Sequence, residues 1–137
     1  MDIQKIDKNL LTSLHEEAKQ SPRLRMNFDL RTSSADQSQR MLNALEPGTL
    51  VPIHQHTETT ETIICIEGSL DVILYDNQDV SGEAAGTDSP FRERMRITLS
   101  SSGSNRGLQI PVGVWHTVEV KEPATIFEAK DGAYVPR

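Results

Sequence analysis

Three histidines and one glutamate are spaced along this chain as the ligands of a metal ion would be. His54 and His56 are separated by one residue, so an extended segment points both imidazoles to the same face. The turn-like residues 57–60 allow Glu61 to return from the next strand, and His116 follows a Pro/Gly turn. Imidazole favours iron, nickel, copper and zinc, and a carboxylate extends the range to manganese. The spacing therefore predicts a site for one divalent transition metal.

The chemistry predicted for this site depends on whether the ion keeps open coordination positions. An octahedral ion held by four side chains can still bind water or a bidentate oxygen substrate, and it then acts as a Lewis acid, a template or an activator of dioxygen. Zinc held by all four side chains would be closed and structural. The sequence leaves iron, nickel, manganese and zinc as alternatives.

Three arginines are candidates for holding an anionic ligand near this metal. In order of preference they are Arg40, Arg25 and Arg23, because a guanidinium can fork a carboxylate or a phosphate. For each arginine the alternative is an ordinary surface role. Arg40 and Asn43 are separated by an odd number of positions, so a regular strand directs only one of them toward the metal. Further polar groups that could line a cavity are Tyr75, Lys130 and Tyr134.

Four other residues are predicted to have no direct role at the metal site. His15 is expected on the surface of the first helix, and Glu58 is expected to face solvent rather than to support a ligand. Cys65 is expected to be a small apolar core residue. Trp115 is expected to point away from the metal as a core or interface anchor, because neighbours in a strand alternate faces.

The element that opens the chain is a predicted amphipathic helix. Apolar residues recur at three- and four-residue steps from Ile3 to Ala18, with charged residues on the other side. Asp7 or Asn9 can cap the helix, and Ser21 ends it because a residue before proline disfavours helical geometry. A helix of this length does not stand alone, so its apolar stripe is expected to pack on the barrel or on a second subunit.

Short strands are predicted to follow this helix. Alternating apolar and polar residues predict a half-buried strand over 23–30, and the unbroken apolar run 62–66 predicts a central strand buried on both faces. Charges at 92–96 predict a solvated edge strand, and residues 76–79 predict a turn. The other strands are predicted over residues 39–45, 70–75, 91–99, 106–110, 115–120 and 124–129. About nine or ten short strands separated by turn signals predict an all-β sandwich or barrel.

Length and charge limit the classes of function. A chain of 137 residues is predicted to form one domain. A formal net charge of -6 and the lack of a Lys/Arg cluster argue against nucleic acid as a partner. The sequence has no apolar run long enough to span a membrane and no signal-peptide core, so a cytoplasmic location is predicted. The single Cys65 agrees with a reducing compartment.

The residues from Gly48 to Gly68 resemble the first motif of the cupin superfamily, G-x5-H-x-H-x4-E-x6-G, without a gap or a substitution. The second cupin motif, G-x5-P-x-G-x2-H-x3-N, is met at Pro111, Gly113 and His116. It departs at both ends, with Asn105 in the glycine place and Val120 in the asparagine place. Gly107 is expected to serve the turn instead.

This resemblance implies an all-β double-stranded β-helix, the cupin or jelly-roll barrel, with a short N-terminal α-helix. Residues 1–22 would form a helical extension and residues 23–137 a single barrel domain. The resemblance places the metal inside the barrel toward one mouth, held by His54, His56, Glu61 and His116.

Beyond the two motifs, the chain is similar to the WbuC-type cupin metalloproteins from about residue 6 to residue 136. The similarity is carried by residues 21–23, 39–48, 111–117, 127–130 and 134–136. Members of that family are often encoded among bacterial surface-polysaccharide genes. The resemblance therefore implies a metal-binding protein linked to polysaccharide biosynthesis, and it does not supply a reaction.

Three classes of function are consistent with these observations. The first is a metal-dependent enzyme that acts on a small oxygenated, sugar-derived molecule by dioxygenation, isomerisation or lyase chemistry. The second is a non-catalytic module that binds a small molecule or sugar, and the third is a structural metalloprotein. The expected partners are a small-molecule ligand and a second copy of the chain, since a homodimer would cover the outer face of strand 62–66.

Overall fold

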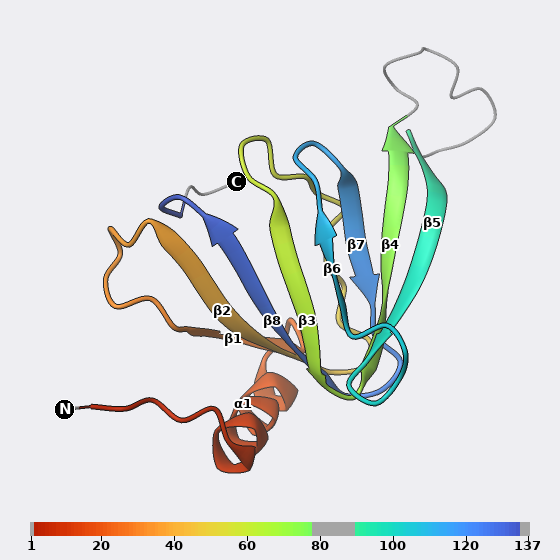
Figure 1. The fold of residues 1–137 in the computed structure, drawn as a ribbon. Coiled ribbons are helices and arrows are strands. Elements are labelled where there is room, and N and C mark those ends of the chain that lie inside the picture. The colour runs from red at the N-terminus through yellow and green to blue at the C-terminus, as the bar shows by residue number, and fades with distance from the viewer. Residues whose placement is uncertain (1, 78–89, 135–137) are drawn as a thin grey trace.

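Two antiparallel sheets face each other and enclose the core of the molecule (Figure 1). The computed structural model describes residues 2–77 and 90–134. The elements in chain order are α1 Lys8–Gln20, β1 Arg25–Asp29, β2 Ser38–Leu45, β3 Glu61–Glu67, β4 Ser69–Asn77, β5 Phe91–Ser100, β6 Gly107–Ile110, β7 Trp115–Glu119 and β8 Ala124–Asp131. Sheet A has the order β1-β2-β8-β3-β6, and sheet B has the order β5-β4-β7. The predicted all-β double-stranded β-helix with a short N-terminal helix is confirmed.

Each predicted strand range corresponds to one strand of the structure, although the described residues form eight strands rather than nine or ten. β5 lies at the edge of sheet B, and its residues 92–96 are exposed, as their charges predicted. The predicted turn at 76–79 is wrong where it is described, because Asp76 and Asn77 extend β4. The rest of that turn lies outside the described residues.

Aliphatic side chains from both sheets fill the space between them. The buried residues of this inner cluster are Leu45, Ile63, Cys65, Leu70, Val72, Leu99, Ile110, Val120, Ala124 and Ile126. Cys65 is buried in this cluster, which confirms its prediction as a small core residue. Burial of these apolar side chains is the main force that holds the sheets together.

Strand β3 is buried on one face and only partly covered on the other. Glu61, Ile63 and Cys65 are buried on the inner face. On the outer face, Ile66 packs against the cluster under α1, whereas Ile64 is 38% exposed. The prediction that this strand is buried on both faces is therefore wrong, because no element of the described chain fully covers Ile64.

Two glycines are required where backbones approach closely. Gly68 has a φ of +72° at the passage from β3 to β4, and a Cβ there would collide with the carbonyl oxygen of Pro123. Gly107 does not serve the turn that was predicted for it. It begins β6 opposite Ile64, and a Cβ there would collide with the carbonyl oxygen of Ile63.

Helix α1 begins later than the apolar spacing predicts. Its N-cap is Asp7, whose Oδ1 accepts a hydrogen bond from the backbone N–H of Leu10 at 3.0 Å. The preceding Ile3 and Ile6 are exposed and lie outside the helix. The helix ends at Ser21, which is extended as expected for a residue before proline. The cap therefore sets the N-terminal boundary, even though the apolar period continues upstream of it.

The apolar stripe of α1 packs against the outer face of sheet A (Figure 1). The buried residues of this outer cluster are Leu11, Leu14, Ala18, Leu42 and Ala44. Partly buried Met26, Phe28, Ile66 and Phe127 pack around them. The helix thus covers the barrel of its own chain. The division into an extension of residues 1–22 and a barrel of residues 23–137 stays a prediction.

His15 is not a surface residue, which corrects its prediction. Its side chain is 13% exposed, and its Nδ1 lies 2.6 Å from Oε2 of Glu46, whose side chain is 8% exposed. Its Nε2 lies 2.7 Å from Oγ1 of the fully buried Thr125, which in turn donates to Glu67. The imidazole therefore joins α1 to β8 and to the segment after β2.

Among the described residues, the 13-residue α1 is too short and too polar to cross a membrane, and no other helix is present.

Replacing His15 by Ala should lower the free energy of unfolding by about 2 kcal/mol, because the buried Glu46 carboxylate and the Thr125 hydroxyl lose their partner. Chemical denaturation followed by circular dichroism measures this change. The control is Lys19→Ala, which removes an exposed pair with Glu16 and should change stability by less than about 0.5 kcal/mol. Equal effects of the two substitutions would contradict the role given to His15.

Candidate metal centre

The imidazoles of His54, His56 and His116 meet in space. One nitrogen of each ring lies within 4.8 Å of the corresponding nitrogens of the other two. The ring centroids of His54 and His116 are 4.3 Å apart, and those of His54 and His56 are 5.1 Å apart. The two-residue spacing and the Pro/Gly turn thus bring three imidazoles to one place.

Backbone pairing sets part of this convergence. His54 and His116 form an isolated antiparallel bridge, in which each N–H donates to the other's carbonyl oxygen at 3.0 and 2.8 Å. Residues directly opposite in an antiparallel pair present their side chains on the same face. The segment that carries His54 therefore lies beside β7, at the edge of sheet B.

Hydrogen bonds of the Nδ1 atoms determine which nitrogen of two rings faces the cluster. His54 Nδ1 donates to the carbonyl oxygen of Pro52 at 2.8 Å, and His116 Nδ1 donates to that of Val114 at 2.9 Å. A carbonyl oxygen only accepts, so Nδ1 carries the proton and Nε2 of the neutral ring presents a lone pair. Backbone carbonyls orient metal-ligating histidines in this way.

Glu61 stands against two of these rings. Its side chain is 2% exposed, and its oxygens lie 3.3 Å from His116 Nε2, 3.3 Å from His56 Nε2 and 3.3 Å from Lys130 Nζ. Burial opposes ionisation of the Glu61 carboxyl, but the two imidazoles and the Lys130 ammonium together hold its pKa below its ordinary value. The group is therefore a carboxylate, which can only accept.

The three imidazoles could hold a divalent metal ion, and Glu61 lies beside two of them. The Nε2 atoms of His56 and His116 are buried and have no hydrogen-bond partner among the described residues. An imidazole nitrogen and a carboxylate oxygen at this distance repel each other unless a proton on the ring or a metal cation lies between them. Ligand atoms at about 2.0–2.2 Å from one ion lie about 3 Å from each other, close to the spacing seen between these nitrogens and Glu61. The donor set could hold a divalent transition metal.

His54, His56 and Glu61 line a cavity of about 780 Å³. The other strand residues that line it also belong to sheet A and are Arg25, Asn27, Gln39, Met41, Asn43, Glu128, Lys130 and Asp131. Sequence spacing did not identify Asn27, Gln39 or Glu128. The signal that finds them is the cross-strand register, which pairs Asn27 with Asn43, Met41 with Glu128 and Gln39 with Lys130.

The three arginines proposed for ligand binding are placed differently. Arg23 and Arg25 line the cavity, and Nη1 of Arg25 donates to the carbonyl oxygen of Leu50 at 2.9 Å. Arg40 does not line the cavity. Its guanidinium bonds Asp36 at 3.0 Å and, with a backbone N–H, lowers the pKa of Asp36 to about 2. Asn43, on the other parity of the same strand, is the residue that faces inward.

Of the other polar and aromatic candidates, some lie in the cavity and others lie outside it. Lys130 and Tyr134 line it, and so does the exposed Glu58. Tyr75 packs instead against Phe91, with ring centroids 6.1 Å apart, and Trp115 packs against the same ring at 5.0 Å. Neither Tyr75 nor Trp115 contributes to the cavity lining.

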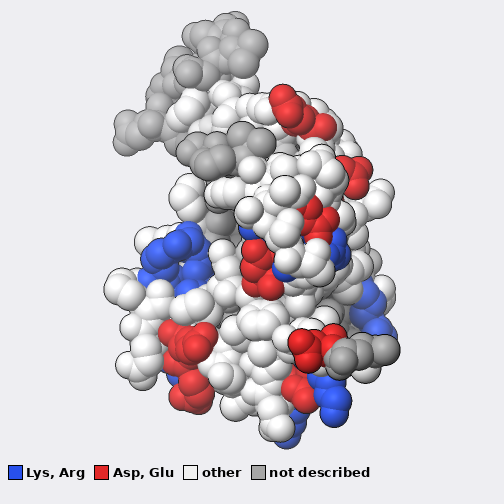
Figure 2. Space-filling model, turned by 90° about the vertical axis from the view of Figure 1, so that its left-hand side faces the viewer, with Lys and Arg blue, Asp and Glu red and all other residues white. Residues whose placement is uncertain are grey.

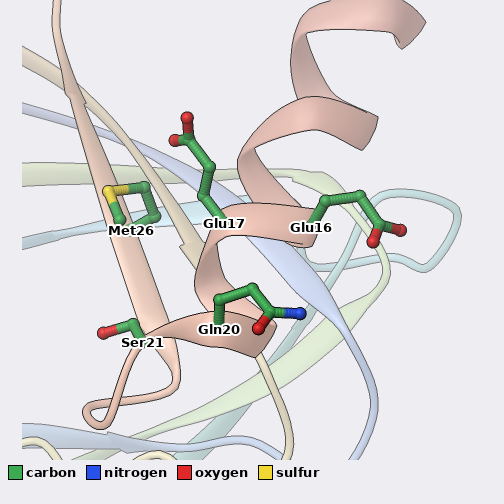
Figure 3. A pocket seen from close by; sticks show the side chains of 5 residues that line it. All are labelled: Glu16, Glu17, Gln20, Ser21 and Met26. Atoms are coloured by element: carbon green, nitrogen blue, oxygen red, sulfur yellow. The ribbon is translucent and has the colours of Figure 1, made fainter.

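A second hollow lies outside the barrel, between the end of α1 and the start of β1 (Figure 3). Three of its five lining residues, Glu16, Glu17 and Gln20, are exposed, and their side chains diverge rather than meeting at one point. On the molecular face of Figure 2, acidic and basic side chains are interspersed. Neither feature provides the basic surface that a nucleic acid needs.

Comparison with known proteins gives a family match and a fold. The family model described as "Domain of unknown function (DUF6016)" matches residues 6–85, more than half of the chain. No curated protein matches the chain. The chain is similar in structure to a cupin-2 domain containing protein from Shewanella frigidimarina, with 22% identity, a TM-score of 0.52 and coverage of 76% of this chain and 79% of that one.

Two other solved structures are similar to the chain. One is TT1209 from Thermus thermophilus, with 19% identity, a TM-score of 0.62 and coverage of 96% of this chain and 98% of that one. Another is CapF, a capsular polysaccharide assembling protein from Staphylococcus aureus, with 18% identity and a TM-score of 0.63. It is matched over 85% of this chain but only 30% of its own length. At these identities the likeness shows the cupin fold alone.

Replacing a ligand of the candidate centre should remove the metal. In His116→Ala, His54→Ala and Glu61→Gln, metal affinity should fall by more than about tenfold, since even the outer partners of ligands are worth about 10- to 100-fold. Plasma mass spectrometry of the purified variants measures the metal content.

The control is Glu58→Gln, which alters an exposed carboxylate in the same cavity and should leave the metal content unchanged. Full retention of metal in the His116→Ala or His54→Ala variant would refute the ligand assignment.

Proposed function

The chain belongs to the family defined by the domain of unknown function DUF6016, and we propose that it is a metal-dependent cupin enzyme that acts on a small oxygenated molecule. His54, His56, Glu61 and His116 would hold one divalent ion. When bound, this ion would supply Lewis-acid or redox chemistry to a substrate oxygen. Iron, nickel, manganese and zinc remain the alternatives for its identity.

The observation that carries this proposal is the close approach of two imidazole nitrogens to one carboxylate in a buried site. Two imidazole Nε2 atoms stand 3.3 Å from the oxygens of Glu61, and both are buried without a hydrogen-bond partner among the described residues. Such an arrangement is unfavourable in a protein interior unless a proton on the ring or a metal cation compensates it. A metal ion is the cation that suits imidazole and carboxylate together.

The cavity beside the site supports a role with open coordination over a purely structural one. Its volume of about 780 Å³ lies within the size range of small-molecule sites. A structural zinc site is closed by its ligands and needs no adjacent cavity. The chain's own contribution to chemistry would be to position a ligand between the histidines and sheet A, with the Lys130 ammonium beside Glu61.

Two similarities support a polysaccharide context for the ligand. The residues that resemble the WbuC-type cupin metalloproteins imply a product of surface-polysaccharide genes. Independently, a structural neighbour of the chain, CapF, is described as a capsular polysaccharide assembling protein. We therefore propose a sugar-derived molecule as the ligand. A non-catalytic sugar-binding role is the alternative, favoured by the same cavity.

Metal analysis of protein purified without a metal-affinity column tests the proposal. We expect a stoichiometric transition metal, or stoichiometric uptake of iron(II) under anaerobic reconstitution. Nitric oxide added to the iron form should then give an electron paramagnetic resonance signal of iron nitrosyl, because an open position is accessible. Tightly held zinc that no added ligand perturbs would replace the enzyme proposal by a structural role, and no metal under either condition would end both.

We also propose a homodimer. Within one chain, α1 covers Ile66 but leaves Ile64 38% exposed on the outer face of β3. A second copy would bury this side chain and the neighbouring edge strand β6. Light scattering at tens of micromolar protein should give about twice the chain mass of 15.3 kDa. A species of 15.3 kDa alone would contradict the dimer.

A further inference from the structure

The inner face of sheet A changes character along its strands. Toward one end its residues are apolar and belong to the inner cluster, as Leu45, Ile63 and Ile126 do. Toward the other end of the same strands the face becomes polar and lines the cavity, as Asn43, Glu61 and Lys130 show. Barrel interiors are ordinarily filled by apolar side chains. The polar half is therefore the part of the interior whose composition packing alone does not explain.

Terminal amides form the central feature of this polar half. We call Asn27, Gln39 and Asn43 the amide wall; they lie on β1 and β2 and all line the cavity. Asn27 is directly opposite Asn43 in the strand register. Gln39 Nε2 donates to the carbonyl oxygen of Gly132 at 3.3 Å, which leaves its side-chain oxygen available to a ligand.

Asn43 carries the argument because its side-chain oxygen is buried and accepts no hydrogen bond from the described residues. An unpaired buried carbonyl oxygen is unfavourable, and a leucine at this position would remove the penalty. The residue lines the cavity, so a partner can reach it only from the cavity side or from within the protein. No described protein donor is in place, so the partner is an ordered water or a ligand hydroxyl that takes its place.

The chemistry of an amide selects the class of that ligand. A hydroxyl group both donates and accepts, so it satisfies the amide whichever way its oxygen and nitrogen are oriented. A carboxylate or a phosphate dianion only accepts, so it leaves the amide oxygen without a donor in either orientation. Carboxylates of Glu128 and Asp131 line the same cavity, and they accept from hydroxyls but repel anions.

We infer that the amide wall binds a neutral polyhydroxy compound, a sugar ring or a polyol, with Asn43 as its specificity-determining residue. The inference rests on the proposed function, because the same cavity contains the candidate metal centre. It is an alternative to an anionic ligand forked by arginine, for which Arg23 in the cavity lining is still a candidate. Arg40 is bound to Asp36, and Arg25 is held by the Leu50 carbonyl oxygen at 2.9 Å.

Ligand-observed nuclear magnetic resonance on the full chain tests the inference. The neutral probes are myo-inositol, D-glucose, D-galactose and L-rhamnose, and the anionic probes are citrate and D-glucose 6-phosphate, all at millimolar concentration. At least one neutral probe should bind, and no anionic probe should bind more tightly than it does. Absence of binding by every neutral probe, or tighter binding of an anionic one, would overturn the inference.

Two variants of Asn43 separate a ligand-binding role from a structural one. Asn43→Leu and Asn43→Ala should each weaken the best neutral probe by about tenfold or more, the loss expected for one hydrogen bond that leaves a partner unpaired. Without a probe, Asn43→Leu should unfold at a higher temperature than the wild type, because the unpaired amide is gone. A lower midpoint together with unchanged probe binding would make Asn43 a structural residue.

A matched control and a metal measurement keep this inference separate from the proposed function. Gln109→Leu alters an exposed amide on β6 and should change neither probe binding nor metal content. The metal content of Asn43→Leu should equal that of the wild type. If metal binds normally and the Asn43 variants retain the probe, the inference fails and the proposed function stands. If His116→Ala retains the metal, the proposed function fails whatever the probes do.

Discussion

A carboxylate that is almost completely removed from water cannot remain unpaired, and Glu61 imposes this constraint on the whole barrel. Its partners come from three other places in the chain: His56 from the segment before β3, His116 from β7 and Lys130 from β8. Two of them belong to sheet A or its approach, and one belongs to sheet B. The carboxylate of Glu61 therefore finds its partners only when sheet A has this strand order and sheet B packs against sheet A.

The local part of this arrangement could be predicted from the sequence. Alternation in an extended chain is a two-residue period, so the common direction of His54 and His56 and the inward face of Glu61, Ile63 and Cys65 follow from spacing. Each predicted strand range also has a counterpart in the structure. These features depend on residues close to one another in the chain, which is why the sequence contains them.

Other features depend on contacts between distant residues and could not be predicted. His15 is buried because Glu46 and Thr125, separated from it by 31 and 110 positions, meet it in the fold. Arg40 lies outside the cavity, where its guanidinium pairs with Asp36 in a loop whose path the sequence does not specify. The sequence singled out Asn43 but missed the amide wall as a group, because Asn27 meets Asn43 only through the pairing of β1 with β2. Polar residues at positions that packing would fill with apolar ones are common at functional sites.

The bridge between His54 and His116 determines where the chain can accept inserted residues. Because the two residues exchange backbone hydrogen bonds, their imidazoles share a face through strand register rather than through the lengths of the loops that join them. Insertions in the connection between β2 and Pro52, or in the loop 57–60, can be absorbed without moving either ring. A single residue inserted between Pro111 and His116 would bring a different side chain opposite His54. The fold thus tolerates variation in loop length but not in the few residues that set this register.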